Sequence, residues 1–231
     1  MKFPRALVFD MDGLMIDSER LYVAAEREIA ASFGRTVSDE TLGKMMGRKP
    51  VESLEIYVRE AGLPISAEEA FEIRSGIMRR KLGEDLRPMP GLDRILARFR
   101  GRLKLAVATG AQAEFLRIAI SGLRLEGAFD VLQDSDGIAT GKPDPDIFLA
   151  ACRRLELPPA SCVVLEDSQN GVAAGRRAGC YVIAVPNEYT RSHDFSPADF
   201  VAAGLDGASE HIESLLEAAD GGVPRLRPGQ Q

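Results

Sequence analysis

The sequence predicts an α/β fold: a doubly wound, Rossmann-like parallel-sheet core with an inserted helical-bundle cap domain. Short apolar runs alternate with helical stretches along most of the 231 residues, a pattern typical of a parallel sheet covered by helices on both faces. A block of consecutive helices without a convincing strand interrupts this alternation. Because the alternation resumes after the block, we predict that the block is a module inserted behind the first strand.

The predicted strands are apolar runs that are too short to form helices. The first is Ala6–Phe9, and it ends in an acidic motif. The others are Leu105–Ala108, Val163–Leu165 and Val182–Val185. We expect a helix to begin near Ala111, after the second run, and another to open at Pro145, where the fixed φ of proline suits a first helical turn.

Three helices are predicted in the inserted block. The first carries apolar residues at every fourth position and stops at a glycine: Leu21, Ala25, Ile29 and Phe33. The second is expected to start at Pro50 and to end at Gly62. The third follows Ser66 and Glu69, which have the spacing of a capping box, and it runs through Leu82.

These patterns divide the chain into two domains. The core is predicted over residues 1–16 and 87–231, and the helical cap over residues 17–86, with hinges near Leu14–Asp17 and Gly83–Pro90. Residues 221–231 are rich in Gly, Pro, Arg and Gln and lack periodicity, so this tail is predicted to be disordered.

Composition narrows the classes of partner. A formal net charge of −6 argues against a nucleic-acid partner, and no apolar run reaches the length of about 18 residues that a membrane span needs. The N-terminus lacks the apolar stretch of a signal peptide. The three cysteines, Cys152, Cys162 and Cys180, form no Cys-x-x-Cys pattern, which argues against a zinc site and fits buried thiols in a reducing compartment. We therefore expect a cytoplasmic monomer that acts on a small molecule.

The most informative motif is Asp10-Met11-Asp12-Gly13, directly after the first predicted strand. Ligands of open parallel sheets bind beyond the carboxyl ends of the strands. One of the two carboxylates can attack phosphorus or hold a metal, while the other moves a proton to the leaving oxygen. The same four residues can also form a solvated acidic turn, but three further signals favour a ligand-binding site.

Two of these signals are groups that suit a phosphate. Thr109 and Gly110 follow the second strand run and offer a hydroxyl and a backbone N–H. Lys142 lies between a glycine and a proline at the start of the helix expected at Pro145. An ammonium held there can neutralise a phosphate or orient the Asp10 carboxylate.

The third signal is a second pair of acids, Glu166 and Asp167, directly after the run Val163–Leu165. Gathering them with Asp10 and Asp12 raises their pKa values and destabilises the fold unless a cation relieves the repulsion. Oxygen ligands of this kind are typical of Mg²⁺, which also bridges to substrate phosphates. The cluster therefore predicts a magnesium site.

Taken together, these motifs resemble those of a known family, the haloacid dehalogenase superfamily. The resemblance rests on the order, spacing and strand context of four motifs: Asp10-x-Asp12, Thr109, Lys142 and Glu166-Asp167. The segments DMDGLMIDSE and GKPDPDIFL resemble the branch of sugar phosphatases and phosphoglucomutases, in which a helical cap follows the first motif. DMDGLMIDSERLY also resembles the pseudouridine-5′-phosphatase-like group.

The resemblance implies a magnesium-dependent phosphatase that hydrolyses a small phosphomonoester, a sugar phosphate or a nucleotide-like compound, through an aspartyl-phosphate. It implies that Asp10 is the nucleophile and a metal ligand, and that Asp12 is the general acid and base and gives Mg²⁺ its backbone carbonyl. Asp167 is implied as a direct ligand, and Glu166 as a ligand or as a group just behind the ligands.

The remaining implied roles concern the phosphate and the leaving group. Thr109 and the Gly110 N–H are expected to bind the transferring phosphoryl group, and Lys142 to orient Asp10 and offset charge. A loop in the cap carries two cations ahead of a helix and is expected to reach the substrate: Gly47, Arg48 and Lys49.

Other functions fit less well. Family members that act as dehalogenases lack the second aspartate, which is present here as Asp12. A β-phosphoglucomutase shares the motifs and the cap but places a histidine where this chain has Tyr22. The two histidines, His193 and His211, lie far downstream and are interpreted as surface or C-terminal helix positions. A non-catalytic module would have lost a motif residue, and a phospho-aspartate signalling module would not explain the cap.

Overall fold

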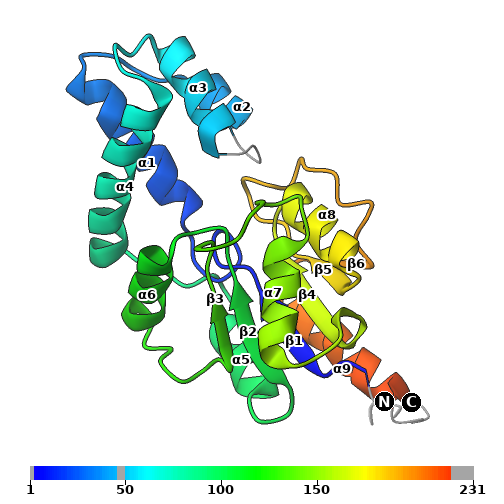
Figure 1. The fold of residues 1–231 in the computed structure, drawn as a ribbon. Coiled ribbons are helices and arrows are strands. Elements are labelled where there is room, and N and C mark those ends of the chain that lie inside the picture. The colour runs from blue at the N-terminus through cyan, green and yellow to red at the C-terminus, as the bar shows by residue number, and fades with distance from the viewer. Residues whose placement is uncertain (1–2, 46–49, 220–231) are drawn as a thin grey trace, which may run out of the picture.

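The computed structural model describes residues 3–45 and 50–219 and contains one six-stranded parallel sheet flanked by helices (Figure 1). The strands are β1 Ala6–Phe9, β2 Lys104–Ala108, β3 Val131–Gln133, β4 Cys162–Glu166, β5 Tyr181–Ala184 and β6 Phe200–Val201. Their order across the sheet is β3-β2-β1-β4-β5-β6. The predicted fold class is confirmed, and the four predicted runs are β1, β2, β4 and β5.

Strand β1 lies in the middle of the sheet, and its register aligns the ends of its neighbours. Phe9, the last residue of β1, pairs with Val107 of β2 and Leu165 of β4. The residues that follow these three strands therefore emerge at the same edge of the sheet. Ligand-binding groups distant in sequence meet there.

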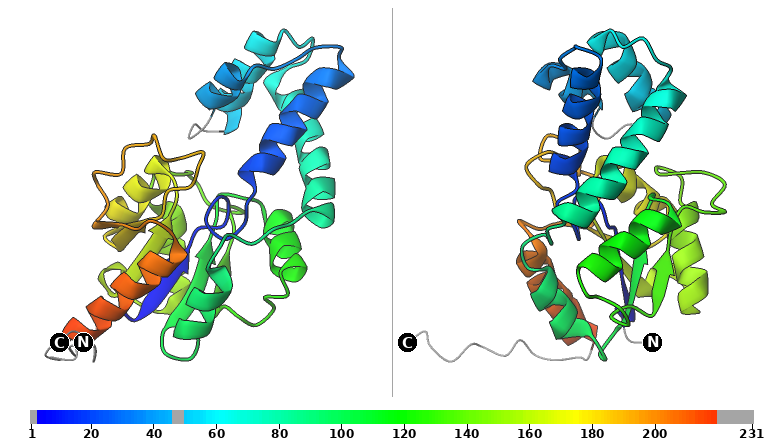
Figure 2. Two further views of the ribbon diagram at one scale, coloured as in Figure 1. Left: turned by 180° about the vertical axis from the view of Figure 1, so that it is seen from behind. Right: turned by 90° about the vertical axis from the view of Figure 1, so that its left-hand side faces the viewer.

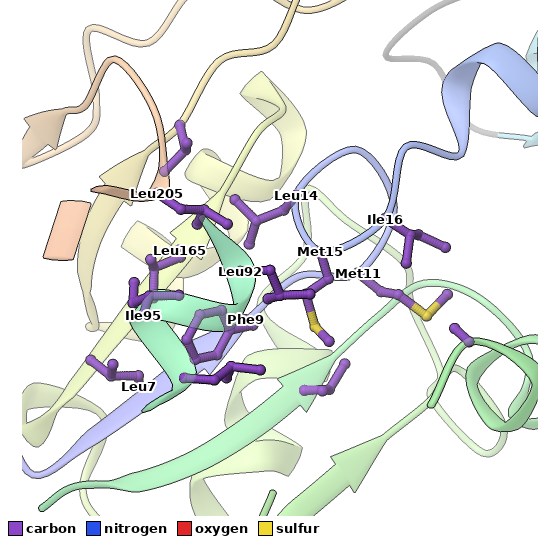
Figure 3. Packing of buried hydrophobic residues seen from close by; sticks show 14 of the residues in the cluster. Leu7, Phe9, Met11, Leu14, Met15, Ile16, Leu92, Ile95, Leu165 and Leu205 are labelled. Atoms are coloured by element: carbon purple, nitrogen blue, oxygen red, sulfur yellow. The ribbon is translucent and has the colours of Figure 1, made fainter. Parts of the chain in front are cut away.

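Alternate residues of the strands face two separate apolar cores. Leu7 and Phe9 of β1 lie in one core with helices α5 (Leu92–Phe99), α6 (Ala113–Gly122) and α9 (Leu205–Ala219) (Figure 3). Ala6 and Val8 face the other core, with α7 (Asp146–Leu155) and α8 (Gln169–Ala178). Both faces are buried, which explains why the strands are continuous apolar runs.

Four helices, which we call the cap helices, gather beyond the end of the sheet toward which the strands point (Figures 1 and 2). They are α1 Glu19–Ser32, α2 Asp39–Met45, α3 Pro50–Ala61 and α4 Ala67–Glu84. Leu54 and Tyr57 of α3 and Ala70 of α4 belong to an apolar cluster of their own. The predicted capping box is present: Ser66 Oγ accepts from Glu69 N at 3.1 Å, and Ser66 N donates to Glu69 Oε2 at 2.8 Å.

The longest described helix is α4, with 18 residues. Neither it nor any other helix within residues 3–45 and 50–219 combines the length and apolar character that crossing a membrane requires.

The two segments that connect the cap helices to the sheet run side by side. Asp17 N donates to the Arg87 carbonyl at 3.0 Å. The Arg20 guanidinium donates to Asp17 Oδ2 at 2.9 Å and to Asp85 Oδ2 at 2.5 Å, so it contacts both segments. These contacts lie at the predicted hinges, although the division into domains stays a prediction.

The three cysteines are free and buried in the core that α7 and α8 cover. Cys152 and Cys180 approach each other, with 3.9 Å between their sulfur atoms. They come from α7 and from the residue that precedes β5, so their proximity is a product of the fold rather than of a sequence motif.

Candidate active site

A cavity of about 220 Å³ lies at the edge of the sheet where β1, β2 and β4 end. Its walls contain every residue predicted for catalysis, phosphate and metal in the core: Asp10, Asp12, Thr109, Gly110, Lys142, Glu166 and Asp167. The structure therefore brings together residues that are spread over more than 150 positions of the chain. The predicted cap residues Gly47, Arg48 and Lys49 fall outside the described residues, as does the predicted disordered tail.

Lys142 connects two of the buried acids. Its ammonium donates to Asp10 Oδ1 and, at 2.6 Å, to Glu166 Oε1. Burial alone would lower the pKa of Lys142, but Asp10 and Glu166 raise it above the ordinary lysine range. Burial raises the pKa of Asp10 to about 8, because the opposing effect of Lys142 is smaller and Glu166 and Asp12 add to the rise.

Glu166 is held by two more hydrogen bonds. Its Oε2 accepts from Ser168 N at 2.8 Å and from Ser168 Oγ at 2.9 Å. Both carboxylate oxygens are thus engaged, one by Lys142 and one by Ser168. This arrangement fixes the position of Lys142, and through it the position of Asp10.

Glycine at position 171 makes room for Glu166. A Cβ atom on Gly171 would lie 1.6 Å from Glu166 Oε1. We expect Gly171→Ala to displace the carboxylate from Lys142, to lower the free energy of unfolding by about 2 kcal/mol or more, and to reduce phosphatase activity with it. Denaturant unfolding and phosphate release measure the two effects.

Gly76→Ala is the matched control, because Gly76 also lies within a helix but a Cβ there meets nothing within 4 Å. Alanine has the higher helix propensity, so this variant should be as stable as the wild type or more stable. A Gly171→Ala protein that kept both stability and activity would contradict the assigned position of Glu166.

Asp12, Thr109 and Gly110 face the cavity from the ends of β1 and β2. Burial raises the pKa of Asp12, although Ser18 and Lys142 oppose the rise. Thr109 is fully buried, and its Oγ1 accepts from Ala111 N at 3.0 Å. The following helix, α6, begins at Ala113, after the N-cap residue Gln112. A hydroxyl and a backbone N–H therefore lie beside the two aspartates.

Asn187 is a site residue that sequence reasoning missed. From the loop after β5, its Nδ2 donates to Asp167 Oδ2 at 2.8 Å and to the Gly13 carbonyl at 3.0 Å. Gly13 has a φ of +75°, and a Cβ there would lie 2.3 Å from Asp167 Oδ2. Asn187 thus joins the acidic turn after β1 to the acid after β4, which no local motif of the loop indicated.

His193 corrects the interpretation of the histidines. It lines the cavity together with Tyr189 and Thr190, and its Nδ1 is buried with no hydrogen-bond partner among the described residues. The interpretation as a surface or helix position did not anticipate that His193, which is half-buried in a loop, lines this cavity. It holds for His211, which lies on α9 and is stacked on Phe200 with 3.8 Å between the ring centroids.

The donor set of the cavity fits a hard divalent cation. Burial raises the pKa of Asp167 well above its ordinary value, and Glu166 and Asp10 add to this. A bound cation would relieve the repulsion and keep these acids ionised. Within residues 3–45 and 50–219 no three His, Cys, Asp or Glu side chains form a ready metal cage. Mg²⁺ needs no such cage, since it typically binds one or two carboxylates and completes its shell with waters and substrate phosphate.

Comparison with known proteins identifies the family to which the chain belongs. Residues 7–185 match the family model of haloacid dehalogenase-like hydrolases. The phosphorylated carbohydrates phosphatase of Thermotoga maritima is 35% identical over 175 residues, which cover 75% of this chain and 81% of the relative. The probable pseudouridine-5′-phosphatase of Drosophila melanogaster is 35% identical over 205 residues, or 86% of this chain and 88% of the relative.

A solved structure has a fold similar to that of this chain. CbbY from Rhodobacter sphaeroides, in complex with phosphate, is similar with a TM-score of 0.77 and 28% identity, over 88% of this chain and 95% of that chain. The family match covers β2 to β5 and all of β1 except Ala6. The chain therefore belongs to the haloacid dehalogenase-like hydrolase family, and it is an enzyme of the phosphoric monoester hydrolase class.

Proposed function

We propose that the protein is a magnesium-dependent phosphatase that hydrolyses a small phosphomonoester, a sugar phosphate or a nucleotide-like compound, through an aspartyl-phosphate on Asp10. One observation carries the proposal: the buried Asp10 carboxylate is oriented by Lys142 in the same cavity as Asp12, Thr109 and Gly110. The substrates named for the Thermotoga and Drosophila relatives, phosphorylated carbohydrates and pseudouridine 5′-phosphate, support this substrate class.

In the first step, an Asp10 carboxylate oxygen attacks phosphorus and the ester bond to the leaving oxygen breaks. Thr109 and the Gly110 N–H hold the oxygens of the transferring group, and Lys142 offsets their charge. Asp12 donates a proton to the leaving alkoxide, for which the raised pKa of this acid is suited. An alcohol departs and the phosphoryl group stays on Asp10.

In the second step, water attacks the aspartyl-phosphate. Asp12, now ionised, takes the proton from that water, so phosphate leaves and Asp10 is regenerated as a carboxylate. Asp10, Asp167 and the Asp12 carbonyl would hold Mg²⁺, which would supply positive charge to offset that of the phosphoryl oxygens. Glu166 acts behind these groups and orients Lys142, because both of its oxygens already accept hydrogen bonds.

The predicted cap, residues 17–86, is proposed to close over this cavity. Contacts between it and the core include the bond from Asp17 N to the Arg87 carbonyl at 3.0 Å and the pair of Arg79 of α4 with Glu114 of α6 at 2.6 Å. Closure would exclude water from the first step. A β-phosphoglucomutase activity is the alternative, but the position of its histidine is taken here by Tyr22.

Removal of the metal tests the proposal. Protein treated with a chelator should release phosphate from p-nitrophenyl phosphate at least about 100-fold more slowly than after Mg²⁺ is restored, because the ion contributes several kcal/mol of charge stabilisation in such sites. Acid-quenched protein analysed by mass spectrometry should carry the phosphoryl group on the peptide that contains Asp10.

Two results would contradict the proposal. The first is equal turnover with and without Mg²⁺, and the second is a phosphoryl group on another peptide. A phosphoryl group that stays on Asp10 for minutes during turnover conditions would instead favour a phospho-aspartate signalling module.

A further inference from the structure

The loop between β5 and β6 forms a wall of the catalytic cavity to which the reaction steps above give no role. Thr190 and His193 of this loop line the cavity, and the loop lies at the end of the sheet that faces the cap helices (Figures 1 and 2). The strand order places β2 and β5 on opposite sides of the central pair, β1 and β4. Thr190 and His193 therefore approach the acids at the ends of β1 and β4 from the side opposite to Thr109.

Asn187 holds this loop against the site. Its Oδ1 accepts from Tyr189 N at 2.8 Å and from Thr190 N at 3.1 Å, while its Nδ2 donates to Asp167 Oδ2 at 2.8 Å. His193 N donates to the Thr190 carbonyl at 2.8 Å, which closes a turn from which both side chains reach the same cavity. The two side chains are therefore positioned before a ligand binds, which favours binding.

Both side chains have hydrogen-bonding capacity that the protein does not use. Neither ring nitrogen of His193 has a hydrogen-bond partner within residues 3–45 and 50–219, and Nδ1 is buried. Thr190 is 5% exposed and its Oγ1 accepts from Asn187 N at 3.1 Å, but the hydroxyl proton has no acceptor in the part of the chain that the structure describes. Buried polar groups are nearly always paired, so unused groups on a cavity wall indicate a ligand.

The imidazole of His193 is a neutral donor. Charging it would leave a buried Nδ1–H without an acceptor, which is costly. Burial also lowers the pKa of His193, although Glu166 opposes this. Acids of the cavity such as Asp10 and Asp167 favour an N–H over a lone pair at the nitrogen that can reach them. The proton therefore lies on Nε2, so Thr190 and His193 each offer one neutral donor.

A phosphate group matches what this wall offers. Its three non-bridging oxygens are acceptors, and hydrogen bonds to ionised oxygens are stronger than those between neutral groups. Thr109 and Gly110 approach these oxygens from the β2 side. The cavity of about 220 Å³ is smaller than the roughly 300–1,000 Å³ of pockets for drug-sized ligands, so one phosphate group can contact both sides.

We propose that His193 and Thr190 form a second wall of the phosphate-binding site, in which His193 Nε2–H and the Thr190 hydroxyl donate to oxygens of the phosphate group from the side opposite to Thr109 and Gly110. The contact is to the phosphate and not to the leaving group, so it persists when the ester has been hydrolysed to inorganic phosphate. The wall therefore strengthens the binding of substrate and product alike, which lowers KM rather than raising kcat. This proposal rests on the proposed phosphatase function.

The first test measures the binding of inorganic phosphate to the magnesium-loaded protein by calorimetry. His193→Phe keeps an aromatic ring but removes the donor, and it should weaken phosphate binding by about 10- to 100-fold. His193→Gln should recover most of the affinity, because its amide nitrogen can lie near the position of Nε2. Thr190→Ser keeps the hydroxyl and should bind phosphate more tightly than Thr190→Val, which has nearly the shape of threonine.

Turnover separates this role from a contact with the leaving group. His193→Phe should raise KM for p-nitrophenyl phosphate and for fructose 1-phosphate by the same factor, about tenfold or more, and should change kcat by less than about threefold. The inhibition constant of inorganic phosphate should rise in parallel. Binding of Mg²⁺ in the absence of phosphate, followed as a rise in melting temperature, should stay as in the wild type.

Matched controls come from the same loop. Arg191 and Ser192 are exposed and do not line the cavity, so Arg191→Gln and Ser192→Ala should change neither phosphate affinity nor KM. Arg191→Gln removes a positive charge close to His193, and it therefore separates the loss of a hydrogen bond from a general effect of charge. Thermal unfolding should show every variant to be folded.

Several outcomes would overturn the proposal while leaving the phosphatase reaction intact. These are unchanged phosphate affinity in His193→Phe, a His193→Gln protein that binds no better than His193→Phe, a rise in KM confined to one of the two esters, or a loss of Mg²⁺ binding in His193→Phe without phosphate. A wild-type protein that neither binds phosphate nor hydrolyses either ester would instead refute the proposed function, and this proposal with it.

Discussion

Replacing Asp10 by asparagine should reduce turnover of p-nitrophenyl phosphate by at least about 10⁴-fold, the scale seen when a covalent nucleophile is removed. Asparagine has nearly the same shape, so the buried site at the end of β1 stays filled, but an amide cannot attack phosphorus. The amide oxygen can still accept the hydrogen bond from Lys142. Phosphate release in the presence of Mg²⁺ measures the effect.

The same substitution should stabilise the metal-free protein. Asp10 has its pKa raised from 3.8 to about 8 by burial, so the folded state is penalised when this group ionises. The penalty is absent below pH 3.8, grows as the pH rises, and is complete above about pH 8. The gain in melting temperature of Asp10→Asn over the wild type should therefore increase across this range in the presence of a chelator.

Asp93→Asn provides a control for this pair of effects, since Asp93 is an exposed residue in the first turn of α5. It should change neither turnover nor stability. If Asp10→Asn retained turnover within tenfold of the wild type, Asp10 could not be the nucleophile, and the aspartyl-phosphate pathway would have to be abandoned.

Replacing Lys142 by methionine should impair both stability and catalysis. The lysine side chain is only 14% exposed and contacts two carboxylates that are themselves buried. Without the ammonium, the buried carboxyl groups of Asp10 and Glu166 lose the cation that they share, and breaking a buried ion pair in this way costs about 3–5 kcal/mol. Denaturant unfolding of the metal-free protein measures this loss, and the turnover assay shows the loss of charge neutralisation at the phosphate.

A double variant separates the two effects of Lys142. Adding Glu166→Gln to Lys142→Met removes one of the two buried carboxylates that Lys142 had paired. Part of the lost free energy of unfolding should therefore return, while turnover stays low. Equal stability of Lys142→Met and the wild type would show that the ammonium does not hold these acids together. If the double variant regained turnover, the role of Lys142 in catalysis would be only structural.

The sequence was sufficient for those parts of the fold that have a strong local pattern. Strand β1 coincides with the predicted run Ala6–Phe9, and the helix after Ser66 begins at its capping box. Strand β3 has three residues and β6 has two, which is too short for any periodicity to show. Helix α2, Asp39–Met45, is a seven-residue segment with a glycine inside, so its helical state depends on packing against α3 rather than on propensity.

The residues of the candidate active site also divide into those that a local sequence pattern predicts and those that depend on tertiary contacts. Residues directly after strands were predictable, because the register of β1, β2 and β4 places such residues at one edge. Asn187 and His193 were not, since they come from an irregular loop that is ordered by tertiary contacts such as the bond from Asn187 to Gly13. Glu19 could have been suspected, because it ends the segment DMDGLMIDSE, but only the structure shows that it lines the cavity.

The paired connecting segments have a consequence for how this enzyme can change over evolution. Besides the bond between Asp17 and Arg87, Met89 N donates to the Met15 carbonyl at 2.9 Å, so the chain leaves the core and returns to it at one point. The entropy of closing such an excursion depends only weakly on its length. Insertions or whole exchanges among the cap helices are therefore expected to leave unchanged the strand register that brings the residues after β1 beside those after β4. The cap helices and the strand register that gathers the acids are encoded in separable stretches of the gene.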